Sequence, residues 1–84
     1  MDIQDQVRQF ITTNFYVDDP DELPNSASLL DRGIVDSTGV LEVIGFIEET
    51  FGVHVEDSEM LPDNLDSIER ITAYLKRKVG TAGP

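Results

Sequence analysis

The sequence predicts an all-α fold, a small four-helix bundle of three main helices and one short helix, with a long ordered loop between the first two main helices. Three observations predict it. Three segments repeat apolar residues at the spacing of a helical face, prolines interrupt the first long connection, and 84 residues suffice for one domain with a small core. We expect the domain to cover residues 1–79 and residues 80–84 to form a disordered tail.

The first helix is expected from Asp2 to Phe15. Its apolar residues recur at i, i+4, i+7, i+8 and i+12, which places them on one face of a helix. Acidic residues near its start complement the positive end of the helix dipole. The face turned to the core comprises Ile3, Val7, Phe10, Ile11 and Phe15.

The long connection spans residues 16–36. Pro20 and Pro24 exclude a regular helix or a central strand there. A loop of this length in a small domain needs anchors if it is to be ordered. Apolar residues supply them and are expected to dock on the helices: Leu23, Leu29, Leu30, Ile34 and Val35.

The second main helix is expected from Ser37 to Phe51, soon after a turn at Gly33. At 3.6 residues per turn one face is apolar and the other is polar and acidic. Gly52 is suited to end the helix. The core face holds Val40, Val43, Ile44, Ile47 and Phe51. The outward face holds Thr38, Glu42, Gly45 and Glu49, with Leu41 and Glu48 at its margin.

The last third of the chain predicts a short helix and then a long one. Pro62 suits the first position of a short helical turn. The final helix is expected to be capped by Asp66 or Ser67, with Glu69 three residues after Asp66 in a capping-box arrangement. Its buried stripe comprises Ile68, Ile71, Leu75 and Val79.

Acidic residues dominate the charge, because 17 Asp and Glu face 6 Lys and Arg, a net charge of −11. Fourteen acids and a single base lie between Asp18 and Asp66, whereas bases crowd residues 76–78. Such a surface repels nucleic acid and anionic membranes and attracts proteins with basic patches. No apolar run is long enough to span a bilayer and the first residues do not begin a signal peptide, so a soluble protein of the cytoplasm is expected. We also expect a monomer.

The sequence predicts neither intrinsic catalysis nor a metal site. A nucleophile needs an activating base, and the single histidine, His54, lies in a short apolar segment. The absence of cysteine excludes thiolate metal sites and disulfides. An EF-hand loop starting at Asp57 would place Pro62 at the required glycine, and one starting at Asp18 would place Leu23 there, so neither fits.

Ser37 stands in the first turn of the second main helix, where free backbone N–H groups and the helix dipole favour negative charge. A phosphate attached to this serine would therefore lie in a favourable place. The alternative is that Ser37, or Asp36 beside it, only caps the helix. Asp-Ser also occurs at residues 57–58 and 66–67, but there without the Gly-Ile-Val approach and the long helix that mark the first pair.

Asp36-Ser37 followed by x-x-V-L-E-V-I-x-x-I-E-E-x-F resembles the modification motif of acyl and peptidyl carrier proteins. The resemblance extends upstream into S-L-L-D-R-G-I-V and downstream into L-P-D-N-L-D-S-I-E-R-I-T-A-Y-L, in the right order. It implies that a phosphopantetheinyl transferase esterifies Ser37 with 4′-phosphopantetheine from coenzyme A, and that Asp36 is the motif acid that helps the transferase engage. The arm would supply the thiol that the chain lacks.

The resemblance implies a non-catalytic carrier that holds acyl, aminoacyl or peptidyl thioesters for a biosynthetic pathway, and the kind of cargo stays open. It also implies an acyl- or aminoacyl-activating ligase and downstream transferases or synthases with basic patches as partners. The docking surface would comprise Thr38, Leu41, Glu42, Gly45, Glu48 and Glu49. Many carriers have leucine in place of Thr38 and a large residue in place of Gly45, which leaves the particular partners open. The competing hypothesis is an acidic helical interaction module without a prosthetic group.

Overall fold

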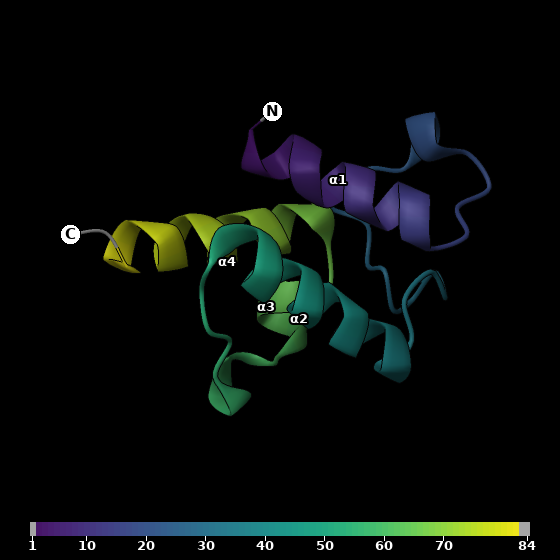
Figure 1. Ribbon diagram of the computed structural model, residues 1–84. Coiled ribbons are helices and arrows are strands. Elements are labelled where there is room, and N and C mark those ends of the chain that lie inside the picture. Colours follow the sequence, from purple (N-terminus) through teal and green to yellow (C-terminus); the bar gives the residue numbers. More distant parts are fainter. Residues whose placement is uncertain (1, 83–84) are drawn as a thin grey trace.

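The computed structural model describes residues 2–82, and its regular structure in this range is helical. The α-helices are α1 (Ile3–Asn14), α2 (Ser37–Phe51), α3 (Pro62–Leu65) and α4 (Ile68–Ala82), with short 3₁₀ helices η1 (Pro20–Glu22) and η2 (Asp57–Glu59). Helix α1 runs in one direction and α2 and α4 return in the other (Figure 1). Helix α4 packs on both α1 and α3. The predicted all-α bundle is confirmed.

The core forms where the apolar faces of the three long helices meet. The predicted α1 stripe is buried at Val7 and Ile11, and its other three residues are half-buried. The predicted α4 stripe is buried at all its positions except Val79. The predicted core face of α2 is buried at three positions, while Val40 and Phe51 are half-buried. Tyr74, which the sequence did not place in the core, is only 1% exposed. The fully buried long side chains are Val7, Ile11, Leu29, Ile47, Val55, Ile68, Ile71, Tyr74 and Leu75.

The long connection is ordered by apolar anchors and by one arginine. Leu23, Leu29 and Val35 are buried, as predicted. From α1, the Arg8 guanidinium donates to the Asn25 side-chain oxygen at 2.9 Å and to the Pro20 carbonyl. The loop is therefore tied to the bundle by polar as well as apolar contacts.

Leu30 was expected to dock on the helices, and this expectation is wrong. Its side chain is 39% exposed, and its N–H donates to the Asp66 carboxylate at 2.9 Å. The hydrogen bond holds the backbone against the junction of α3 and α4, so the side chain is left at the edge of a surface hollow.

The start of α4 is capped by Ser67, whose Oγ accepts the Arg70 N–H at 3.0 Å. The expected capping box of Asp66 and Glu69 is wrong. The Asp66 carboxylate is bonded to Ser28 and Leu30 of the long connection. The Glu69 N–H donates instead to the carbonyl of Asn25, 2.9 Å away, so the loop itself satisfies part of the helix start.

The far end of α4 differs from expectation in two ways. Val79 was expected in the buried stripe but is 41% exposed. The end of α4 projects beyond α1 (Figure 1). The helical backbone continues to Ala82, three residues into the expected tail, and Gly83 and Pro84 lie outside the described residues. The domain boundary stays a prediction.

Candidate functional site

The start of α2 is fixed by Asp36. This residue has extended backbone dihedrals, φ −103° and ψ −174°, and its Oδ1 accepts the Gly39 N–H at 2.7 Å. Its carbonyl accepts the Val40 N–H at 3.0 Å, which begins the helical hydrogen-bond series. Asp36 is therefore the N-cap, and Ser37 is the first residue of the helix.

Ser37 is exposed, and its hydroxyl makes no hydrogen bond to any residue that the structure describes. Because Asp36 performs the capping, the alternative reading of Ser37 as a capping residue is wrong. The hydroxyl stands at the positive end of the α2 dipole, in the first helical turn. It is thus accessible and placed where a phosphodiester is stabilised.

Gly39 allows α2 to begin close to the end of α1. A Cβ added at this buried glycine would lie 2.8 Å from Cε1 of Phe15 and 3.2 Å from Cγ1 of Val35. The aromatic ring therefore packs directly on the backbone of the first turn. At Gly45, by contrast, no side chain of the described residues, chain neighbours aside, lies within 4 Å of the corresponding point.

A surface hollow of about 260 Å³ lies beside Ser37, between the starts of α2 and α3. Its walls are mostly apolar, and one lining residue, Asp66, carries a carboxylate. The lining residues are Leu30, Ser37, Val40, Met60, Leu61, Pro62, Leu65 and Asp66. An exposed hydroxyl with an open, largely apolar depression next to it fits a serine-linked flexible arm.

The predicted docking residues divide into two sets. Thr38, Leu41, Glu42 and Glu49 are exposed, and the Leu41 side chain, at 65%, presents an apolar surface to solvent. Gly45 is half-buried on the same outward face. These residues form a continuous strip along α2.

Glu48 is engaged within the protein. Its Oε2 accepts the Val55 N–H at 3.0 Å and lies 3.2 Å from Nδ1 of His54. The other ring nitrogen of His54 lies 3.7 Å from the Glu56 carboxylate. Glu48 thus joins the end of α2 to the segment that follows it. Because its Oε2 is already hydrogen-bonded within the protein, we expect Glu48 to interact less strongly with a partner protein than Glu42 and Glu49.

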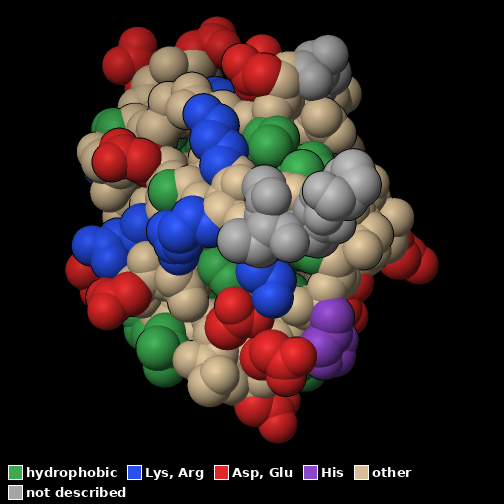
Figure 2. All heavy atoms as spheres, turned by 90° about the vertical axis from the view of Figure 1, so that its left-hand side faces the viewer, with side chains coloured by type: hydrophobic (Ala, Val, Ile, Leu, Met, Phe, Trp, Pro, Cys, Tyr) green, Lys and Arg blue, Asp and Glu red, His purple; other side chains and the backbone are tan. Residues whose placement is uncertain are grey.

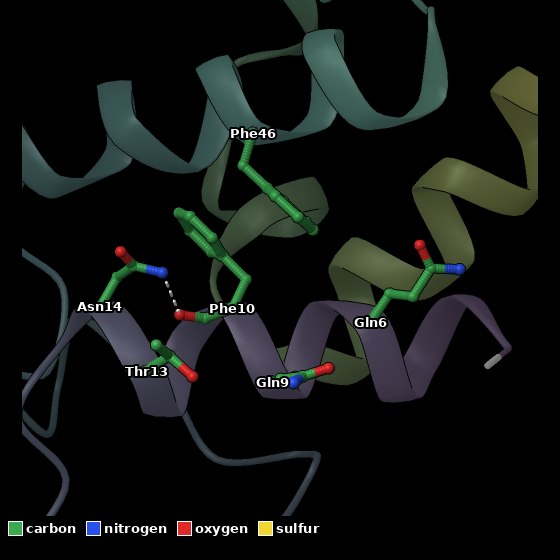
Figure 3. A pocket seen from close by; sticks show the side chains of 6 residues that line it. All are labelled: Gln6, Gln9, Phe10, Thr13, Asn14 and Phe46. Atoms are coloured by element: carbon green, nitrogen blue, oxygen red, sulfur yellow. Dashed lines mark hydrogen bonds between the residues drawn. The ribbon is translucent and has the colours of Figure 1, made fainter.

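A wider hollow, about 580 Å³, lies between α1 and α2, and its walls do not include Ser37. Figure 3 shows Phe46 reaching from α2 towards Phe10 on α1, and the two rings stack with centroids 4.2 Å apart. Phe46 is not among the residues that the sequence predicted to form the core face or the outward face of α2. Its position at the edge of the apolar face of α2 was the signal that could have indicated a second contact with α1.

The other two Asp-Ser pairs differ from the first. Ser67 caps α4 and is only 2% exposed, so a modifying enzyme cannot reach it in the folded protein. Ser58 is exposed, but it lies in the three-residue helix η2. Neither of them combines exposure with the first turn of a long helix.

Basic side chains gather on one face of the molecule, where acidic side chains lie beside them (Figure 2). Figure 2 shows Lys and Arg gathered on the face that holds the end of α4, with acids towards its periphery. Several bases tie α4 to its neighbours: Arg70 lies 3.2 Å from Asp63, and Lys78 lies 3.0 Å from Glu59. Helix α2 contains acids and no base, so its outward strip is negative.

Glu59 organises the segment that carries Met60 and Leu61 to the hollow. Its Oε1 accepts from the Glu56 N–H and from Lys78 at 3.0 Å each, and from the Tyr74 hydroxyl at 3.1 Å. The backbone hydrogen bond, followed by that of Lys78, lowers the pKa of Glu59. Burial, with the neighbouring Glu59 carboxylate, raises the pKa of Tyr74 to about 12.

Two structural features bear on other classes of function. Within residues 2–82, no group of three or more His, Asp and Glu side chains is placed to hold a metal ion. In the same range, no helix has the length and apolar character that a bilayer crossing requires.

Comparison with known proteins defines the class. Residues 5–75 match the phosphopantetheine attachment site family, and the chain belongs to this family. Its members are non-catalytic carriers that hold covalently attached 4′-phosphopantetheine and serve as substrates of phosphopantetheinyl transferases. Carriers of this kind also interact with ligases or transferases. The resemblance seen in the sequence is thereby confirmed.

A more particular similarity is to a D-alanyl carrier protein of Abiotrophia defectiva. The two chains are 35% identical over 52 residues. The aligned region covers 62% of this chain and 66% of the relative, just under two thirds of that protein's length.

Proposed function

We propose that Ser37 is the residue that carries 4′-phosphopantetheine and that Asp36 is the motif acid of the attachment site. This proposal rests mainly on the different positions of the two residues at the start of α2. Asp36 caps the helix, which leaves the Ser37 hydroxyl exposed, without a hydrogen bond to the described residues, and beside an open hollow.

The residues of the chain have limited roles in the attachment itself. The Ser37 oxygen attacks the β-phosphorus of coenzyme A, the pyrophosphate bond breaks, and adenosine 3′,5′-bisphosphate leaves. The serine proton passes to a base of the transferase, since no described side chain bonds to the Ser37 hydroxyl. The N-terminal dipole of α2 then stabilises the phosphodiester. The arm supplies a thiol for thioester chemistry to a chain without cysteine.

The docking surface that we propose is the outward strip of α2. Thr38 and Leu41 would meet the partner near the modified serine, and Glu42 and Glu49 would attract basic patches. Gly45 leaves open space between them. Exposed charge pairs are individually weak, so they steer encounter and keep affinity modest, which suits a carrier that must leave each partner. Glu48 contributes less, because it is bonded to Val55.

For the cargo we propose a small aminoacyl group, with D-alanine the first to test. The relative of Abiotrophia defectiva supports this choice, because its name states that it carries D-alanyl groups. The partners would then be an ATP-dependent ligase that activates the amino acid and a transferase that accepts it. We propose that the protein acts as a monomer in the cytoplasm, on the side of the membrane where coenzyme A and ATP are available.

The attachment is tested by intact-protein mass after incubation with coenzyme A, Mg²⁺ and a broad-specificity phosphopantetheinyl transferase. Wild type should gain one phosphopantetheinyl group, Ser37→Ala none, and the matched control Ser58→Ala one. Modification of Ser37→Ala, or failure of the wild type with several transferases, would contradict the proposal. The modified protein is then incubated with ATP, D-alanine and a D-alanine-activating ligase, with L-alanine as the comparison.

The docking surface is tested with charge reversals. Glu42→Lys and Glu49→Lys should each reduce the rate of modification at low carrier concentration, while Glu69→Lys, an exposed change of the same charge on α4, should not. Equal rates for all three variants would show that the outward strip of α2 is not the contact surface.

A further inference from the structure

Asp66, between α3 and α4, holds three consecutive residues of the long connection. Its Oδ2 accepts from the Ser28 hydroxyl at 2.5 Å, and its Oδ1 accepts from the Leu30 N–H at 2.9 Å. Its backbone carbonyl accepts from the Leu29 N–H at 2.7 Å. Because the carboxylate is half-buried, these bonds are stronger than the same bonds fully exposed to water.

Leu29 links the segment held by Asp66 to the residues that precede Ser37. The Leu29 carbonyl accepts from the N–H groups of Ile34 at 3.0 Å and Val35 at 3.2 Å. The side chains of Leu29 and Val35 are 1% and 3% exposed. Asp36 and Ser37 follow Val35 directly, so movement of Leu29 would displace the approach to the start of α2.

We propose that Asp66 is a positioning residue for the modification of Ser37, an inference that rests on the proposed function. Asp66 fixes residues 28–35, so that the transferase meets one arrangement of the backbone that leads into α2. It also holds Leu30 at the edge of the hollow beside Ser37. It acts through this segment and takes no part in the bond that is made or broken.

A positioning role of Asp66 and a purely stabilising role predict different effects on the kinetics of Ser37 modification. If residues 28–35 are released for part of the time, only a fraction of the molecules can be modified. The apparent KM for the carrier then rises by the inverse of that fraction, while kcat at saturation stays the same. A purely stabilising role would lower the melting temperature and leave KM unchanged wherever the protein is folded.

The test compares Asp66→Ala, Asp66→Asn and the matched control Asp63→Ala in the full chain. Asp63 is an exposed acid three residues earlier that pairs with Arg70 of α4, so its variant removes the same charge and one ion pair nearby but none of the hydrogen bonds that the structure shows to residues 28–35. Initial rates of modification by a broad-specificity transferase are measured over a range of carrier concentrations, at a temperature where circular dichroism shows every variant folded. We expect Asp66→Ala to raise KM about fivefold or more at unchanged kcat, as a competent fraction of about one fifth would require.

Asp66→Asn should have a KM much closer to that of the wild type than Asp66→Ala, because its amide can accept from the Leu30 N–H and donate to the Ser28 hydroxyl oxygen. Equal KM values for Asp66→Ala and Asp63→Ala, or equal rises for Asp66→Ala and Asp66→Asn, would overturn the inference. An unmodified wild type would instead contradict the proposed function.

If Asp66→Ala does not fold, Ser28→Ala is the second test, since it removes the bond to Asp66 Oδ2 together with the bond that Ser28 Oγ accepts from the Asp31 N–H. It should raise KM by a smaller factor and speed amide exchange at Leu29, Leu30 and Val35. No change in either quantity would overturn the inference.

Discussion

Helices α2 and α4 both begin at an Asp-Ser pair, but in different registers. At α2 the aspartate is the N-cap, and the serine is an exposed first helical residue. At α4 the serine is the cap, with its oxygen on the Arg70 N–H, and is 2% exposed. The aspartate there is turned to the long connection, with Oδ2 2.5 Å from the Ser28 hydroxyl.

The difference shows that the dipeptide by itself does not define a modification site. A shift of one residue in the cap decides whether the serine hydroxyl faces solvent or the first turn of its own helix. The surroundings set that register. At α2 the Phe15 ring packs on Gly39 in the first turn. At α4 the Asp66 carboxylate accepts hydrogen bonds from Ser28 and Leu30 and is therefore not available to cap the helix.

Gly39→Ala should destabilise the protein, although alanine is the better helix former. The new Cβ would lie 2.8 Å from the Phe15 ring and 3.3 Å from Asp36 Oδ1, the capping atom. Overpacking costs about 1–3 kcal/mol and outweighs a propensity gain of up to about 1 kcal/mol. Urea unfolding measures the change. An increase in the free energy of unfolding would show that the contact between α1 and α2 is not tight.

Ser67→Ala and Ser37→Ala should differ in stability. Loss of the Ser67 cap should lower the free energy of unfolding by about 1 kcal/mol. Ser37→Ala removes an exposed hydroxyl without a bond to the described residues, so its effect should stay within about 0.5 kcal/mol. Equal losses in thermal or urea unfolding would contradict the difference in register.

Gly45→Ala should stabilise the protein by up to about 1 kcal/mol, in contrast to Gly39→Ala. Apart from its chain neighbours and the backbone of its own helix, no atom of the described residues lies within 4 Å of the position that the added Cβ would take. The same variant should slow transfer from partners that approach this part of α2. A loss of stability in urea unfolding would mean that the backbone at Gly45 is under a constraint unlike that of an ordinary helix interior.

Glu59→Gln should alter stability in a pH-dependent way. The pKa of Glu59 is lowered from its ordinary value of 4.5 by the Glu56 N–H and then by Lys78. Its contribution is therefore fully present above about pH 4.5 and is lost as the pH falls through the folded-state pKa. The stability difference between wild type and variant should shrink on acidification. A constant difference from pH 7 to pH 3 would contradict this assignment.

The sequence predicted what depends on local spacing. The 3.6-residue repeat located α1 and α2 to within a residue, and Gly52 ends α2 in the left-handed region, φ 67°. Pro62 begins α3 as expected. The carrier motif, read as a whole, led to the family that the comparison confirmed.

What the sequence did not predict depends on contacts between distant residues. Asp66 reaches Ser28, 38 residues away, and no spacing rule indicates that pair, so its carboxylate was expected at the cap of α4. The exposure of Leu30 follows from the same contact. The choice of Asp36 over Ser37 as the cap of α2 was also open, because both residue types are good caps.

The location of the phosphopantetheinyl group in the modified protein tests most directly whether Ser37 is the attachment residue. Trypsin would leave all three Asp-Ser pairs in one peptide, because no Lys or Arg lies between Arg32 and Arg70. Cleavage after glutamate separates Ser37 from Ser58 and Ser67, and fragmentation then identifies the serine. We predict one group, on Ser37. A group on Ser58 or Ser67 would contradict the claim that the cap register at α2 makes the site.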